Sequence, residues 1–365
     1  MLLQGCSKLG AMVNFIRIFL VFHLLFVCFF TLCAQTKSES PERTKLAFSY
    51  TWQENKPVRV YLQYSPVNMP DYYFTQLKTG VCSDGLCKPI NIQIRWDLLG
   101  RFLTYHTEER YVLTKFDHVR FTDEDHRQLH KILADTASIL RDYKVEDMID
   151  SATYVKSQQI DAVTRPTSPT FENVTVDGAL YTVYTLWHFA NSSIRKSILG
   201  HTKALLSDSL VIIQMLQSAR RDYVSFVLKT LESKEIYRFS KYIMNLVGHD
   251  DEYIPHFALS YLSDRLLTEP YWQQQLMLYF PEAASSLKNA VLARLKGIPL
   301  NNSSINILLL SLEKMSERQI SAAFGIIDKN KTQLDDRTKT RLMALSKNSN
   351  STISSHAIRL LQKVD

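Results

Sequence analysis

The chain has 365 residues, 22% of them charged, with a formal net charge of +7. This length is sufficient for two hydrophobic cores. The positive charge is scattered, with no basic run longer than two residues and no nucleic-acid-binding motif, so the composition argues against a nucleic-acid partner.

The chain begins with the pattern of a cleaved secretory signal at residues 1–34. Lys8 and Arg17 form a basic region, an apolar run follows from Ile18 to Leu32, and Ala34 is a small residue at the cleavage position. A retained membrane anchor is the alternative, because the apolar core is at the short edge of membrane-spanning length. We predict an exported protein, periplasmic or extracellular, that is either soluble or peripherally associated with a membrane.

Only two cysteines remain once the predicted signal is removed. Cys82 and Cys87 are five residues apart, and two lone cysteines in an exported protein are expected to form a disulfide. A redox-active dithiol is the alternative function for this pair.

The first half of the chain predicts both strands and helices. Residues 58–64 and 90–96 alternate apolar and polar side chains, as half-buried strands do. The second of these leads into a turn at residues 97–100 and a partner strand at 101–106. The members of the clearest apolar series are Ile90, Ile92, Ile94 and Trp96.

Two helices are predicted in the same half. Thr122 is a suitable N-cap for a helix that starts with three acidic residues and carries Leu129, Ile132 and Leu133 on one face. Later, apolar residues recur at helical spacing from Leu180 to Ala190. That stretch also contains Tyr, Thr and Val, which would suit a strand.

From about residue 203 onward the pattern is helical throughout. Roughly ten segments of helical periodicity are separated by short polar, Pro or Gly breaks, and Pro255, Pro270 and Pro281 are expected at helix starts. Successive short helices indicate an irregular array of the HEAT or armadillo kind. A compact all-helical domain is the alternative, because no fixed repeat signature is found.

The stretch 158–170 contains two prolines and four hydroxyl residues. Read from its residues alone, it is a surface connector, because Pro166 and Pro169 prevent regular structure.

The same stretch resembles the flavin-attachment loop of the FMN-binding domains in sodium-translocating NADH:quinone reductase and Rnf complex subunits. In that family an Asp precedes a Ser/Thr-Gly-Ala-Thr motif, whose last Thr holds FMN through a phosphoester bond. Asp161, Thr164 and Thr167 fall at the matching spacing. Blocks similar to those of exported members of the family occur at 82–89, 96–100, 113–118 and 178–188, so the resemblance covers roughly residues 80–190.

The resemblance implies an α+β domain, an FMN cofactor attached to Thr167 by a flavin transferase, and a redox partner protein. Asp161 and Thr164 would shape the loop. Trp187 or His188 is a candidate for contact with the flavin ring, and otherwise Trp187 belongs to the core.

The loop departs from the family where Arg165 and Pro166 replace Gly-Ala. Proline fixes φ and lacks an N–H, so the close approach of backbone to phosphate is lost. Arg165 could bind the phosphate by a bidentate contact instead. Two outcomes therefore stay open, covalent FMN at Thr167 or a related fold without flavin.

No other arrangement of residues predicts catalysis or a metal site. His126 and His130 are one helical turn apart, but the acid expected between them in a metalloprotease helix is absent.

The sequence thus predicts a signal at 1–34, an FMN-binding-like α+β domain at 35–195 and a HEAT- or armadillo-like all-α domain at 196–365. Its predicted function is electron transfer by an exported FMN protein with a helical docking domain. The alternative is a non-enzymatic extracytoplasmic binding or scaffold protein whose flavin loop is vestigial.

Overall fold

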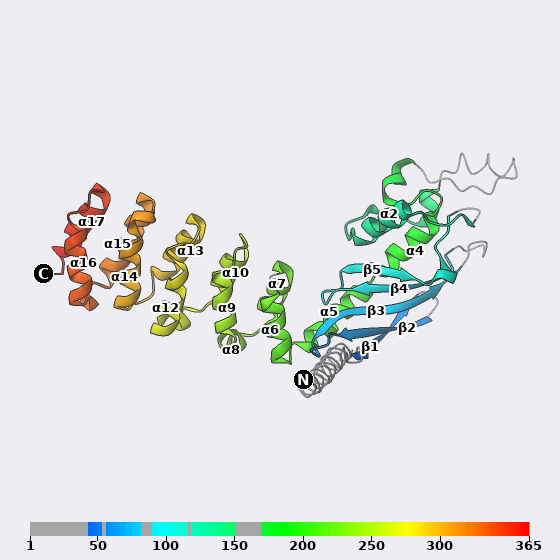
Figure 1. Cartoon of the computed structure of the whole chain (residues 1–365), viewed down its shortest axis with the longest axis horizontal. Helices are drawn as coiled ribbons and strands as arrows, with labels where there is room; N and C mark the ends of the chain where they lie inside the picture. Colours follow the sequence, from blue (N-terminus) through cyan, green and yellow to red (C-terminus); the bar gives the residue numbers. More distant parts are fainter. Residues whose placement is uncertain are drawn as a thin grey trace, which may run out of the picture.

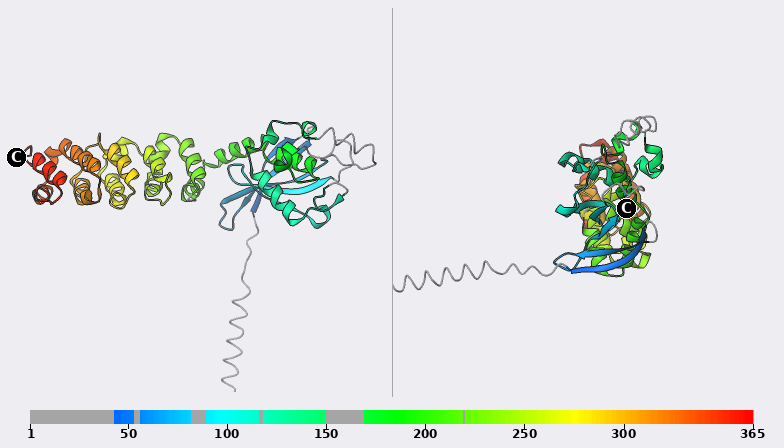
Figure 2. Two further views of the ribbon diagram at one scale, coloured as in Figure 1. Left: turned by 90° about the horizontal axis from the view of Figure 1, so that it is seen from above. Right: turned by 90° about the vertical axis from the view of Figure 1, so that its right-hand side faces the viewer.

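The computed structural model of the chain describes residues 43–52, 56–81, 89–115, 118–149, 169–218 and 220–364. It contains a five-stranded sheet with associated helices, followed by a row of helix pairs (Figure 1). A second view shows the row extending away from the sheet (Figure 2). None of the helices within these ranges has the length and apolar character needed to cross a bilayer. The predicted signal, the Cys82–Cys87 pair and the loop residues Asp161, Thr164, Arg165 and Thr167 lie outside the described residues.

The sheet is an antiparallel meander in the order β1-β2-β3-β4-β5. Its strands are β1 (Arg43–Trp52), β2 (Lys56–Tyr64), β3 (Pro70–Thr79), β4 (Ile90–Trp96) and β5 (Phe102–Thr107). The strands predicted at 58–64, 90–96 and 101–106 are confirmed as β2, β4 and β5. Alternation places one side chain in two on the core face, where Tyr73 is opposite Trp96 and both are fully buried.

Helices cover the core face of this sheet. They are α2 (Asp123–Ala134), α4 (Leu180–Ala190) and α5 (Ile194–Leu205), with short 3-10 turns η2 (Glu109–Tyr111), η4 (Ile139–Arg141), η5 (Val145–Met148) and η6 (Pro169–Val174). Thr122 caps α2 as predicted, and with Asp125 it forms a reciprocal capping box. The residues 180–190 are helical, not extended, and eight of the eleven are buried.

Five helix pairs follow in a row. Their first helices are α6 (Ser209–Gln217), α9 (Ser240–Val247), α12 (Pro270–Tyr279), α14 (Asn302–Ser311) and α16 (Asp336–Leu345). Their second helices are α7 (Arg221–Thr230), α10 (Ile254–Tyr261), α13 (Ser285–Leu295), α15 (Glu317–Lys329) and α17 (Ser351–Leu361). The connections include α8 (Ser233–Arg238), α11 (Asp264–Thr268), η7 (Leu312–Lys314) and η8 (Lys331–Gln333).

The row has a regular spacing that the sequence pattern did not reveal. First helices start at residues 209, 240, 270, 302 and 336, so successive starts are 31, 30, 32 and 34 residues apart. Each first helix packs against the next first helix, and each second helix packs against the next second helix. Pro281 does not begin a helix, contrary to the prediction; it lies in the turn after α12, a position where proline stops a helix from continuing.

Buried amide side chains connect neighbouring pairs. Asn330 accepts a hydrogen bond from the backbone N–H of Leu300 (2.9 Å), and Gln273 donates one to the carbonyl of Pro299 (2.6 Å). Gln319 donates to the carbonyl of Ser285 (3.0 Å). All three amides are buried. Gln273 bonds to the connection that precedes the next pair, Gln319 bonds to the preceding pair, and Asn330 bonds to the connection that precedes its own pair. These bonds satisfy buried backbone groups where successive pairs meet and so help to fix their orientation.

Candidate functional site

Helix α4 holds the segment between α2 and η5 in place through its side chains. Four donors, three on α4 and one at its C-cap, bond to backbone carbonyls of residues 133–143. The bonds run from Tyr184 to Tyr143 (3.1 Å), Trp187 to Asp135 (2.8 Å), His188 to Leu140 (2.9 Å) and Asn191 to Leu133 (3.1 Å). These four bonds therefore fix the backbone of the segment between α2 and η5 against α4.

A cleft of about 640 Å³ opens where this segment, the end of β1 and the start of α5 meet. Its size is in the range of small-molecule binding sites. Residues from β1, the α2–η4 turn, η4, α4 and α5 line it: Trp52, Thr136, Arg141, Tyr184, Trp187, His188, Asn191, Ser192, Ser193, Arg195 and Lys196.

The lining is positively charged and partly aromatic. Arg141, Arg195 and Lys196 contribute cations, and no carboxylate is among the described residues that line the cleft. Trp52 and Tyr184 are half-buried aromatics at its wall, whereas Trp187 is only 3% exposed and belongs to the core. The arrangement favours an anion over a cation.

Two polar atoms of the lining residues have unused hydrogen-bonding capacity. Trp52 Nε1 and Asn191 Oδ1 are buried without a partner within the described part of the chain. Such atoms are uncommon in folded proteins and point to sites where water or a ligand binds.

His188 is a neutral donor in the wall of this cleft. Its Nε2 faces the carbonyl of Leu140, which can only accept, so the ring carries its proton on Nε2. Burial lowers the pKa of His188 below 6.5, and the hydrogen bond to Leu140 opposes this only in part.

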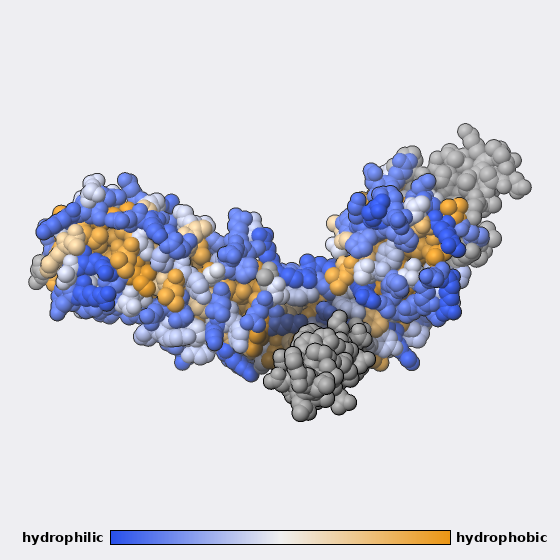
Figure 3. All heavy atoms as spheres, viewed as in Figure 1, coloured by the Kyte–Doolittle hydropathy of each residue, from blue (hydrophilic) through white to orange (hydrophobic). Residues whose placement is uncertain are grey.

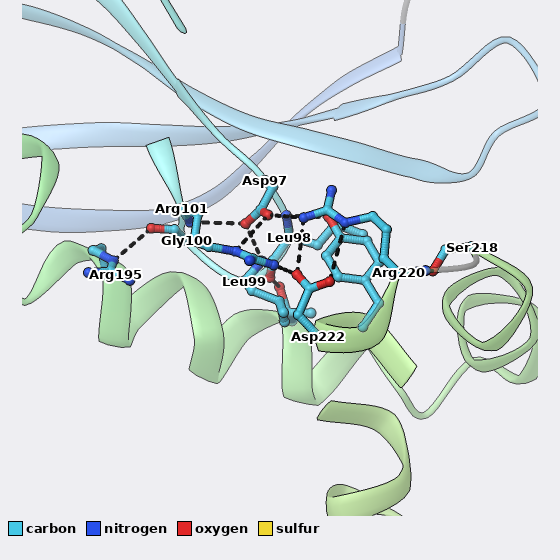
Figure 4. A network of polar contacts seen from close by, with 11 residues as sticks. Asp97, Leu98, Leu99, Gly100, Arg101, Arg195, Ser218, Arg220 and Asp222 are labelled. Atoms are coloured by element: carbon cyan, nitrogen blue, oxygen red, sulfur yellow. Dashed lines mark hydrogen bonds and ion pairs between the residues drawn. The ribbon is translucent and has the colours of Figure 1, made fainter. Parts of the chain in front are cut away.

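A second polar cluster joins the sheet to the row of helix pairs, and Figure 4 shows it from close by. Asp97, in the turn between β4 and β5, is 2% exposed. Its Oδ1 accepts hydrogen bonds from the backbone N–H groups of Leu99 and Arg101, both at 2.9 Å. Its Oδ2 accepts from Arg101 Nε (3.2 Å) and from Arg220 Nη2 (2.7 Å) at the start of α7. We call this cluster the Asp97 joint.

Other contacts extend the joint around the backbone of Leu98. Tyr223 on α7 accepts a hydrogen bond from the Leu98 N–H (3.2 Å), and Thr202 on α5 donates to its carbonyl (2.6 Å). Burial, and secondarily the charge of Asp97, raise the pKa of Tyr223 above its usual value, so this phenol stays protonated. Asp222 completes the cluster through contacts with Arg101 and Arg220.

The cleft and the Asp97 joint share one residue, Arg195. Its Nε donates to the carbonyl of Gly100 (2.9 Å) while the side chain also lines the cleft. Gly100 has φ +73°, and a Cβ there would approach the Arg195 carbonyl to 3.0 Å, so this close contact requires glycine.

The other sequence candidates are not brought together into one site. His126 pairs with Tyr105 (2.6 Å), and His130 faces the carbonyl of Leu103 (2.9 Å). No group of three or more His, Cys, Asp or Glu suited to a metal occurs within the described ranges. Sequence reasoning missed Arg195, Lys196 and Arg220, since isolated basic residues on helices carry no local signal for a shared site.

Comparison with known proteins adds little to this description. No protein family model and no curated protein matches the chain. Among solved structures, a designed armadillo repeat protein is similar, with 12% sequence identity over 67% of this chain and 96% of the designed chain. Its TM-score of 0.17 is too low to carry an argument.

We expect His188 to make the protein less stable as the pH falls below about 6.5. Because burial lowers the pKa of His188 in the folded state, the unfolded state binds the proton more tightly, and protonation favours unfolding. His188→Gln keeps a donor for the Leu140 carbonyl but cannot titrate. The free energy of unfolding in urea, measured at pH 7, 6 and 5, should fall less steeply in this variant than in the wild type.

The matched control is His106→Gln, at an exposed position on β5. His106 does not line the cleft, so the two variants together separate the loss of His188 from the loss of any histidine. Identical slopes for His188→Gln and the wild type would contradict the assignment.

Proposed function

We propose that this protein is a non-enzymatic docking protein, exported from the cytosol, in which a HEAT- or armadillo-like row of helix pairs binds a partner protein. The observation that supports this most strongly is the linear stacking of five pairs with starts 30–34 residues apart. A row in which each pair contacts mainly its neighbours presents a long surface for its mass, and proteins built this way are typically used for binding. The sheet domain is then a module attached to the first pair by the Asp97 joint.

An apolar row on the first helices is the candidate contact surface. Leu278 on α12 and Leu310 on α14 occupy the ninth position of their helices and are 62% and 65% exposed, and Met343 on α16 is 53% exposed. Figure 3 shows that hydrophobic residues reach the surface along the row. Large apolar side chains repeated across successive pairs fit an elongated partner that contacts several pairs at once.

Site-specific photo-crosslinking in the producing organism tests the docking function. A photoreactive phenylalanine analogue placed at Leu310 or Leu278 should give one discrete adduct of higher mass, because the partner covers these positions. The control position is Val67, in the β2–β3 turn, which is 79% exposed but lies on the sheet. Adducts of equal yield at Val67, or none at either leucine, would contradict docking on the row.

Electron transfer by bound FMN is a second candidate function. Two blocks that carry the resemblance to FMN-binding domains, 96–100 and 178–188, belong to elements that pack together. The indole N–H of Trp96, in the first block, donates to the carbonyl of Ala190 (2.9 Å), the last residue of the helix that holds the second block. If FMN is carried, Thr167 would be its anchor, with Asp161, Thr164 and Arg165 around the phosphate, and the isoalloxazine ring would supply the electron-transfer chemistry.

Co-expression with a competent flavin transferase tests this second function. Covalent FMN predicts a yellow pellet after acid precipitation and a mass increment that is lost in Thr167→Ala. Thr170→Ala, a hydroxyl three residues further on, should keep the increment. A colourless protein of unmodified mass would exclude covalent attachment and leave docking as the function.

A further inference from the structure

We propose that the cleft beside α4 binds a small aromatic anion, a planar ring that carries a phosphate or carboxylate group. This binding site goes beyond the docking function and does not depend on it. It also does not depend on Thr167, since every residue that lines the cleft lies within the described ranges.

The positive charge of the cleft favours a ligand that carries an anionic group. Arg195 and Lys196 project from the first turn of α5, and Arg141 comes from η4, so the cations belong to two separate elements. The N-terminal end of α5 adds a favourable dipole for an anion at the same end of the cleft. None of the described lining residues is a carboxylate that would compete with an anionic ligand for these three cations.

Two of these cations are available to an occupant. Lys196 is exposed and has no ion pair among the residues that the structure describes. Arg141 pairs with Asp142 (3.1 Å), but both side chains are more than half exposed, so the pair is weak and can be exchanged for a ligand contact. Arg195 is engaged with Gly100 through Nε, which leaves the outer nitrogens of its guanidinium as donors.

The volume of the cleft and its aromatic wall favour a ligand that contains a planar ring. A space of about 640 Å³ is far larger than one inorganic anion requires. Trp52 packs its ring edge-to-face on Phe189 (5.0 Å between centroids, 90°), and Tyr184 lies against His188 (4.1 Å), so both aromatic walls are held by neighbours. A planar ligand can stack on such fixed rings at little entropic cost. Trp52 Nε1 and Asn191 Oδ1 are a buried donor and a buried acceptor without a described partner on two of the lining residues.

Isothermal titration calorimetry of the chain without its predicted signal tests the proposal, with phenyl phosphate as the probe. Inorganic phosphate lacks the ring, and benzyl alcohol lacks the charge. We expect phenyl phosphate to bind at least about tenfold more tightly than either, because only it uses both features of the cleft. Benzoate in a parallel titration distinguishes a carboxylate ligand from a phosphate ligand.

Two substitutions locate the binding. Lys196→Gln and Arg141→Gln should each weaken phenyl phosphate binding about fivefold to tenfold, as expected for loss of one charge-assisted contact. Neither residue belongs to the Asp97 joint, and circular dichroism should show an unchanged fold. Lys203→Gln is the matched control, an exposed lysine on the same helix α5 outside the cleft, and should bind as the wild type does.

Phenyl phosphate that binds no more tightly than inorganic phosphate would overturn the proposal. Equal weakening by Lys203→Gln and Lys196→Gln would overturn it as well, because binding would then reflect only the net charge of the chain. Tighter binding of benzoate than of phenyl phosphate, with the same dependence on Lys196, would support the site with a carboxylate as its anionic group.

Discussion

Asp97 accepts four hydrogen bonds at a position that is only 2% exposed, two from its own turn and two from guanidinium groups. One guanidinium, Arg220, belongs to the first helix pair, 123 residues further along the chain. A buried carboxylate is tolerated only when its charge is matched and both oxygens are satisfied, and here one of the two matching guanidinium groups comes from the row. Asp97 therefore links the sheet to the first helix pair, alongside the bond from Gln214 on α6 to the carbonyl of Pro70 (3.0 Å).

The same turn links the joint to the cleft. Arg195 reaches the Gly100 carbonyl on one side and the cleft on the other, so an occupant of the cleft would contact a side chain that is fixed by the Asp97 turn. If both proposals hold, the row carries the docking surface, the cleft beside α4 carries the ligand site, and α5 lies between them.

Local sequence signals predicted much of the fold, and contacts between distant residues explain what they missed. Strand β4 could be predicted from the alternation between Ile90 and Trp96, and the start of α2 from the N-cap Thr122. Both signals depend only on residues that are neighbours in the sequence. The regular spacing of the helix pairs was not visible, since the buried amides where successive pairs meet, such as Asn330 and Gln273, sit in otherwise dissimilar repeats. The cleft draws on five elements and the joint on three, and no local pattern marks Arg195 as a member of the first or Arg220 as a member of the second.

Urea unfolding of Asp97→Asn tests most directly whether the joint holds the two parts together. In this variant the amide NH₂, which is a donor, would face the guanidinium donors of Arg101 and Arg220. The two hydrogen bonds that the carboxylate oxygen accepts there would be lost. We predict a loss of about 2–3 kcal/mol in the free energy of unfolding, because a buried carboxylate would no longer neutralise either guanidinium. Asp222→Asn, on a carboxylate of the same cluster whose side chain is 27% exposed, should lose less than about 1 kcal/mol. Equal losses for the two variants, or no loss for Asp97→Asn, would contradict the account.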